Sequence, residues 1–331
     1  MSDRYRLLGA ENSPYSVKVR SFLRYRQVPH DWVLRSQAQD EFQRLARLPL
    51  VPLLVTPEGE GLQDSTPILE SLDARLPGPS IHPPDAAPAF LSALLEEYGD
   101  EWGNKWMFHF RWARELDQLA ASRRLVDDMM PGVDPAQAPR LAAGIRERMV
   151  PRVSFVGSNE TTAPLIETSF VDALDLIEAH LGARAYLFGA RPALADFGLA
   201  AEFYELSLDP TPASALAGRP RVLAWCRRML DPRDEGPFEA LETLLPTLEP
   251  WLRREVAGRF LPWSDANAHA LTGGHESFTV ELEGGVWTQA PQKYHARSLS
   301  VLRQRFSALD AGQRSVLEPI LQRSGCLRWL E

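Results

Sequence analysis

The sequence is poor in cysteine, and it has no apolar run long enough to cross a membrane as a helix. Cys226 and Cys326 are its only two cysteines, and their wide separation fits neither a disulfide framework nor a zinc-ligand spacing. Both lie in amphipathic helical patterns, which predicts two small buried side chains. No charged segment followed by an apolar one appears near the start, so we expect no secretory signal. These absences predict a protein of the reducing cytoplasm.

Positive charge is not in excess either. The chain has 36 lysines and arginines against 44 acidic residues, a net charge of −8, whereas proteins that bind nucleic acid in general are usually basic. Only residues 1–47 differ, with nine basic and five acidic side chains, an excess of +4 that suits a small anionic ligand. Arginines on a solvated helix face explain the same excess equally well.

Several motifs that carry chemistry are missing. The sequence contains no glycine-rich nucleotide fingerprint, no P-loop and no serine, histidine and aspartate grouping. His109 has no ligand partners at a suitable spacing, so no metal site is predicted. With 331 residues, of which 44% are apolar, the chain is long enough for two domains with real cores.

Strands and helices alternate in residues 1–78. Short apolar runs predict strands at 5–8, 31–34, 53–55 and 61–63. Apolar residues at helical spacing predict helices at 14–26 and from residue 65, with a short helix or turn at 41–48. The order is βαβαββα, in which one strand pair is parallel and the other antiparallel. We therefore expect an α+β domain with a mixed sheet.

The pattern changes after a proline-rich linker between Leu76 and Pro88. Residues 86–231 carry apolar spacing typical of helices, which we expect at about 89–121, 136–156, 163–181, 194–207 and 219–230. Residues 232–331 form a C-terminal extension with a predicted small hairpin around Glu283 and two later helices. The chain is therefore predicted to have an all-helical second domain and a third part.

The segment from Asn12 to Arg20 is the most informative. Pro14 suits the first turn of a helix, where its missing N–H has no partner to lose, and Ser13 precedes it at the capping position. The open amides and the dipole of a helix start favour an anion there. Ser13-Pro14-Tyr15-Ser16 stands where a redox protein would carry two cysteines, so disulfide chemistry is not expected.

Four motifs in order resemble those of the glutathione transferase family. They are Ser13-Pro14-Tyr15-Ser16 at a helix start, Val51-Pro52 before a strand, Asp64-Ser65 at the next helix start, and the segment from Tyr186 to Phe197 that ends in Ala195-Asp196-Phe197. The likeness covers about residues 1–230. It implies a thioredoxin-like N-terminal domain, an all-helical C-terminal domain and activity as a homodimeric glutathione transferase.

The resemblance also implies a glutathione site. Val51-Pro52 would be a cis-proline turn whose Val51 backbone pairs with the peptide part of glutathione, and Asp64 and Ser65 would hold its γ-glutamyl end. Ser13 would donate to the sulfur and keep it as a thiolate, with Asn12 as the nearest rival and Ser16 as the second choice. On residue chemistry alone, Ser13 and Ser65 can also be plain helix caps.

The aromatic residues Trp102, Trp106, His109, Phe110 and Trp112 leave two interpretations open. They can line an apolar pocket for an electrophile between the domains, or they can be core or a dimer surface. The sequence before Val51 departs from the family pattern, since Arg47-Leu48-Pro49-Leu50 replaces the usual turn with its lysine. Arg44 or Arg47 would then supply the cation for the glycine carboxylate.

The expected activity is therefore conjugation of glutathione, as co-substrate, to a small apolar electrophile. The alternative is a catalytically silent binding or regulatory protein of the same fold, which the altered loop and the extension favour. A glutathione-dependent thiol reductase is disfavoured, because neither Ser13 nor Ser16 can form a mixed disulfide.

Overall fold

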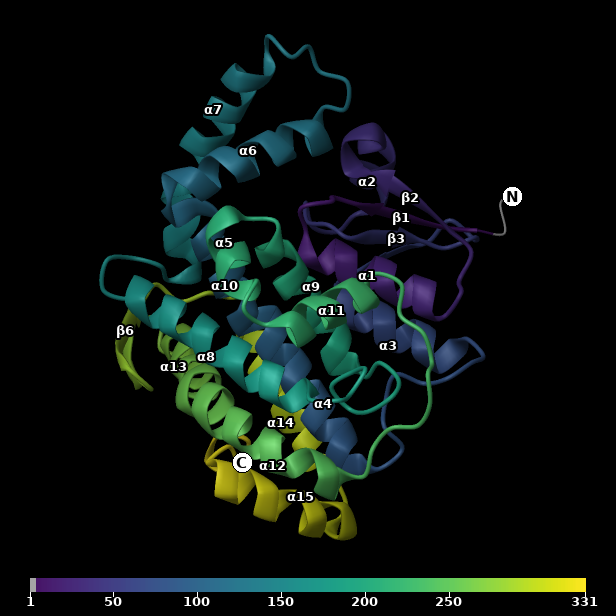
Figure 1. Ribbon diagram of the computed structural model, residues 1–331, viewed down its shortest axis with the longest axis vertical. Helices are drawn as coiled ribbons and strands as arrows, with labels where there is room; N and C mark the ends of the chain where they lie inside the picture. Colours follow the sequence, from purple (N-terminus) through teal and green to yellow (C-terminus); the bar gives the residue numbers. More distant parts are fainter. Residues whose placement is uncertain (1–3) are drawn as a thin grey trace.

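A mixed four-stranded sheet organises the N-terminal part of the computed structural model, which describes residues 4–331 (Figure 1). Its strands are β1 (Tyr5–Gly9), β2 (His30–Leu34), β3 (Leu53–Val55) and β4 (Gly61–Gln63). They lie in the order β2-β1-β3-β4. β1 is parallel to β2 and antiparallel to β3, and β3 is antiparallel to β4. The predicted mixed sheet is confirmed, and each strand starts within one residue of its expected position.

The helices of this part are α1 (Pro14–Tyr25), the short η1 (Arg35–Gln37), α2 (Gln39–Leu45) and α3 (Ser65–Arg75). Helix α1 begins where predicted: Pro14 is its first residue, and the Ser13 hydroxyl accepts from the Ser16 amide at 3.3 Å. Its apolar face, with Val19, Phe22 and Leu23, is fully buried.

The second part is all helical. Its elements are α4 (Ala86–Tyr98), η2 (Gly99–Gly103), α5 (Asn104–Ala113), α6 (Glu115–Met129), α7 (Ala138–Met149), η3 (Val150–Val156), α8 (Ala163–Leu181), α9 (Leu194–Ser207), α10 (Pro210–Leu216) and α11 (Pro220–Met229). Helices α8 and α9 have the predicted bounds.

One predicted helix is wrong. Residues 89–121 do not form a single helix, because Gly99–Gly103 adopts a wider π-type turn and Arg114 is extended. A Cβ atom on Gly99 would lie 2.9 Å from the Leu199 side chain, so the close approach of η2 to α9 requires glycine there. Glycine is a poor helix former, which is consistent with the interruption.

Asp196 secures the segment that resembles the family signature. Its carboxylate accepts hydrogen bonds from the backbone N–H of Leu187, the backbone N–H of Ala193 and the Trp225 indole, each at 2.8 Å. Ala193 has no side-chain oxygen that could cap α9, so only the contact from the Ala193 amide to the Asp196 carboxylate, one half of a capping box, is present. The same carboxylate also joins the turn before α9 to α11.

The extension consists of α12 (Leu241–Trp251), η4 (Leu252–Phe260), α13 (Leu261–Thr272), the hairpin β5 (Phe278–Leu282) and β6 (Gly285–Gln289), α14 (Ala296–Ser307), α15 (Ala311–Ser324) and η5 (Leu327–Trp329). The predicted hairpin and the two later helices are confirmed. In Figure 1, α12 and α15 lie at the end of the molecule opposite α6 and α7.

The extension shares the core of the helical part. Glu255 of η4 accepts from the Tyr98 hydroxyl at 2.9 Å and from the Ser169 hydroxyl at 2.6 Å. The Ser169 oxygen in turn accepts from the indoles of Trp102 and Trp106. These two rings, together with Trp112, His109 and Phe110, are buried. Of the two interpretations of the aromatic residues, core is therefore right and a pocket lining is wrong.

The buried side chain of Lys18 connects the sheet-containing part to the helical part. Its side chain is fully buried, and its ammonium donates to Asp100 Oδ2 at 2.6 Å, to Thr66 Oγ1 at 2.9 Å and to Glu96. Burial alone would lower the pKa of Lys18, but Asp100 and Glu96 hold it above its ordinary value. One cation thus connects α1 to the start of α3 and to the helical part.

We expect Lys18→Met to destabilise the protein by about 3–5 kcal/mol, because it leaves buried carboxylates without their cation. Urea unfolding of wild type and variant measures the difference. Lys293→Met, at an exposed lysine, is the matched control and should stay within about 0.5 kcal/mol. Adding Glu96→Gln and Asp100→Asn should recover part of the loss. A loss for Lys18→Met as small as the control's would contradict the role given to Lys18.

Candidate active site

The register of the sheet gathers three of the predicted motifs at one end. Leu8, near the end of β1, pairs with Leu53 at the start of β3, and Leu53 pairs with Gln63 at the end of β4. The chain therefore leaves β1 towards Ser13, enters β3 from Val51-Pro52 and leaves β4 into Asp64-Ser65 at the same edge. Strand pairing alone brings these segments together.

Ser13 caps α1 and keeps its hydroxyl proton available. Its oxygen accepts from the Ser16 amide, so the O–H can still donate to a ligand. Ser16 itself is buried, and its hydroxyl accepts from the Ala10 amide at 3.3 Å. The phenol of Tyr15 donates to the Asp100 carbonyl at 2.9 Å, and burial raises its pKa well above the ordinary value. Ser13 is thus the better-placed donor at this helix start.

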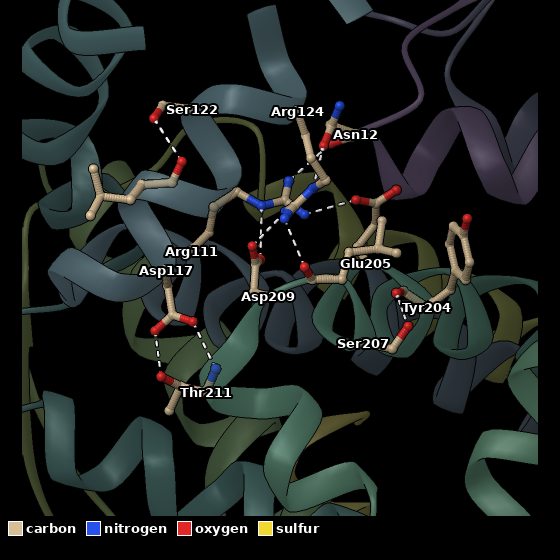
Figure 2. A network of polar contacts seen from close by, with 12 residues as sticks. Asn12, Arg111, Asp117, Ser122, Arg124, Tyr204, Glu205, Ser207, Asp209 and Thr211 are labelled. Carbon is tan, nitrogen blue, oxygen red and sulfur yellow. Dashed lines mark hydrogen bonds and ion pairs between the residues drawn. The ribbon is translucent and has the colours of Figure 1, made fainter. Parts of the chain in front are cut away.

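Asn12 belongs to a different network, shown in Figure 2. Its amide oxygen accepts from Arg124 at 3.2 Å, and its backbone carbonyl accepts from Arg111 at 3.0 Å. Arg111 also donates to Glu205 at 2.7 Å, and both arginines contact Asp209. The buried charges of the helical part therefore fix the loop immediately before Ser13.

The structure contains the Val51–Pro52 bond as cis, as the family resemblance implied. The unusual loop before it is held by Gln63, whose amide oxygen accepts from the Leu48 amide at 3.0 Å and whose amide nitrogen donates to the Leu50 carbonyl at 2.9 Å. Gln63 thus supplies local contacts for a loop that lacks the usual turn sequence.

Asp64 and Ser65 form the start of α3. Asp64 has φ +79°, and its side chain makes no capping hydrogen bond. Ser65 is buried, and within residues 4–331 no partner is found for its hydroxyl. The helix start and this hydroxyl are together suited to a carboxylate.

The extension reaches Asp64. Arg297 of α14 donates to Asp64 Oδ2 at 3.2 Å, and Arg305 pairs with Glu70 of α3. Asp64 and Arg297 line a cavity of about 180 Å³ together with Tyr15, Tyr294, Glu97 and Asp100. Burial raises the pKa of Asp64, that of Asp100 to about 7 and that of Glu97 to about 8. The extension therefore forms one wall of the predicted γ-glutamyl site, and a chain with only the first two domains would lack this wall.

A larger cleft of about 610 Å³ opens between the sheet and the helical part. Its floor includes Gly9, Ala10 and Val51, and its walls come from α2, α6 and the α7–η3 junction. The apolar side chains that line it are Phe42, Leu125, Met129 and Met130, and the charged ones are Arg35, Asp128, Arg148 and Arg152. None of the aromatic residues Trp102, Trp106, His109, Phe110 and Trp112 lines this cleft.

Sequence reasoning missed these arginines. Arg44 or Arg47 was expected to supply a cation for the glycine carboxylate of glutathione, which stays a prediction. Neither of them lines the cleft, whereas Arg35 does. The local charge excess of residues 1–47 included Arg35 without singling it out. The i, i+4 spacing of Arg148 and Arg152 was the available signal for the opposite wall.

The described residues contain neither a metal-binding cluster nor a helix that could span a membrane. Across residues 4–331 no group of His, Cys, Asp and Glu is arranged to hold a metal ion, and His109 is paired with Ser158 and Glu167. Burial lowers the pKa of His109. No helix in the same range is long and apolar enough to cross a membrane.

Comparison with known families agrees with this geometry. Residues 7–80 match the N-terminal domain of glutathione S-transferases, and residues 160–228 match their C-terminal domain. The first segment spans the sheet-containing part and the second lies within the helical part, in the expected order. The chain belongs to the glutathione transferase family. No curated protein matches the sequence.

Several solved structures of glutathione S-transferases and related enzymes are similar to this chain at low sequence identity. A glutathione S-transferase from Methylobacterium radiotolerans, in complex with glutathione sulfonate, has 22% identity and a TM-score of 0.44, over 72% of this chain and 96% of that one. A β-etherase from Sphingobium sp. strain SYK-6 has 17% identity and a TM-score of 0.49, over 74% and 99%. An enzyme from Methylobacillus flagellatus with glutathione bound has 19% identity and a TM-score of 0.40, over 70% and 99%.

Proposed function

We propose that this protein is a glutathione transferase that conjugates glutathione to a small apolar electrophile. The observation that carries the proposal is the Ser13 hydroxyl at the start of α1, on the same end of the sheet as Val51 and Ser65 and beside a cleft large enough for a second substrate. In this pose the Val51 backbone pairs with the cysteinyl part, and Ser65 and Asp64 take the carboxylate and ammonium of the γ-glutamyl group.

The chemistry rests on stabilising a thiolate. A thiol of pKa about 8.5 is only slightly ionised at neutral pH, and lowering it by about two units requires about 2.7 kcal/mol of preference for the anion. One hydroxyl donating to a charge contributes about 1.5–3 kcal/mol, and the helix start adds to it. The thiolate sulfur then forms a bond to the electrophilic carbon, and the leaving group departs with its bonding electrons.

The contact between Arg297 and Asp64 favours the alternative of a catalytically silent binding or regulatory protein, because it engages the acid that would hold the ligand ammonium. The side chain of Arg297 is 68% exposed, however, and that of Asp64 is 28% exposed. An exposed ion pair contributes about 1 kcal/mol or less. Glutathione can therefore displace or share it at small cost, and we favour the enzyme.

Ser13→Ala tests the sulfur contact. We expect more than about a tenfold loss of turnover with a panel of aryl halides, epoxides and peroxides, because the thiolate loses its donor. The pKa of bound glutathione, followed through the ultraviolet absorbance of the thiolate against pH, should rise. Ser13→Thr keeps the hydroxyl and should retain activity. If Ser13→Ala is unchanged and Asn12→Ala is inactive, the donor is Asn12.

Titration calorimetry with glutathione tests the γ-glutamyl end. Asp64→Asn should raise the Kd about tenfold, since an ammonium loses a charged acceptor, and asparagine tolerates the positive φ at this position. Arg297→Ala should change the Kd by less than about fivefold, because the pair is exposed. Tighter binding by more than tenfold in Arg297→Ala would instead support a site closed by the extension. No binding of wild type at millimolar glutathione would reject the enzyme.

A homodimer in the cytoplasm completes the proposal. Leu48 and Leu50, beside the Val51–Pro52 turn, are 51% and 55% exposed, which suits burial against a second copy. Cys226 and Cys326 are free and buried, as a reducing compartment allows. Light scattering should give twice the chain mass of 37.1 kDa, and Leu48→Glu with Leu50→Glu should shift the mass towards the monomer. A monomeric wild type would rule the dimer out.

A further inference from the structure

The cleft between the sheet and the helical part has a lining that is chemically divided. Phe42, Leu125, Met129 and Met130 supply apolar surface, and methionine side chains adapt to flat or irregular ligands. Three arginines and one aspartate supply charge, a local excess of +2 in a chain whose net charge is −8. A purely apolar occupant would leave that excess without a counter-charge.

The arginines are available to a ligand. Arg148 and Arg152 lie one helical turn apart across the α7–η3 junction, both are exposed, and neither has a carboxylate partner within residues 4–331. Arg35 stands on the other wall, where its guanidinium donates to the Pro49 carbonyl at 2.9 Å and lies 4.2 Å from the centre of the Phe42 ring. Planar guanidinium groups bind carboxylates with two parallel hydrogen bonds.

The carboxylate of Asp128 makes the end of the cleft near the start of α1 unfavourable for an anionic group. Its Oδ2 atom lies 3.5 Å from the amide nitrogen of Asn12, next to Ser13, and its buried Oδ1 atom is an acceptor without a partner in the described chain. An anionic group placed there would meet a like charge, whereas an uncharged or N–H-bearing group would not. The charged end of a ligand therefore turns towards Arg148 and Arg152, and its uncharged end turns towards the start of α1.

We propose that the second substrate is an apolar or aromatic acid, whose carboxylate is bound by Arg148 and Arg152 while its electrophilic carbon faces the sulfur at Ser13. This inference rests on the proposed function and narrows its substrate class. The reaction is unchanged: the thiolate sulfur bonds to the carbon, and the leaving group departs with its electron pair.

A matched pair of substrates tests the charge. 4-Chloro-3,5-dinitrobenzoate and its methyl ester share the reacting carbon and the chloride leaving group, and only the first is anionic. The measured quantity is the ratio of kcat/KM for acid over ester, each divided by its uncatalysed rate. Arg148→Gln combined with Arg152→Gln should lower this ratio about tenfold, since two partly exposed charge-assisted contacts are lost. Added salt should lower the wild-type ratio as well.

Arg140→Gln is the control, because Arg140 is an exposed arginine of α7 that does not line the cleft. It should leave the ratio within about twofold of wild type. If the double variant and the control give the same ratio while the ester is conjugated, the substrate class is wrong and the transferase proposal stands.

Binding without turnover separates the two proposals further. 3,5-Dinitrobenzoate and its methyl ester lack a leaving group, and calorimetry measures their Kd with or without glutathione. Tighter binding of the acid to wild type, lost in the double variant, supports the anion site even if no conjugation is found. Equal affinity of acid and ester for wild type overturns it.

Discussion

Burial of the Lys18 ammonium is the interaction on which the arrangement of this protein depends. One side chain from α1 satisfies Asp100 and Glu96 of the helical part and the hydroxyl of Thr66 at the start of α3. A buried charge is tolerated only with such partners, so α1, α3 and the helical part have little freedom to move relative to one another. Ser13, which caps α1, and Ser65, the first residue of α3, are therefore held in a fixed position relative to each other.

A second buried network acts on the same loop from the other side. Arg111 and Arg124 hold Asn12, and their acids come from α9 and the residue before α10. The loop before the hydroxyl proposed to hold the sulfur and the helix after it are therefore each held by ion pairs of the helical part. Preorganisation of this kind lets a donor stabilise a charge without reorganising at the moment of reaction. The extension adds to it, because Glu255 completes the polar core around Trp102 and Trp106 while α14 contacts α3.

Local sequence signals correctly predicted much of the N-terminal fold. The cap and proline at Ser13-Pro14, the strand bounds and the mixed character of the sheet follow from turn chemistry, apolar spacing and the order of the elements along the chain. The prediction of one continuous helix over 89–121 was wrong. The π-type turn at Gly99 lies tightly against Leu199 of α9, and this contact arises only when the helices pack, so the local sequence does not show it. The aromatic residues were ambiguous for a related reason: periodicity marks a face as apolar without saying whether protein or ligand covers it.

The amino-acid sequence by itself determined the order of helices and strands in residues 1–78, the cap at Ser13, the position of the Val51-Pro52 turn and the placing of Asp64-Ser65 at a helix start. Each of these depends on neighbours close in the chain. Only the tertiary structure decided that Lys18 is a buried connector, that Arg297 lies beside Asp64, and that Arg35, Arg148 and Arg152 line one cleft. These residues come from elements far apart in sequence. Which distant residues a charged side chain contacts depends on how the elements pack and on where opposite charges are buried, and the local sequence contains neither.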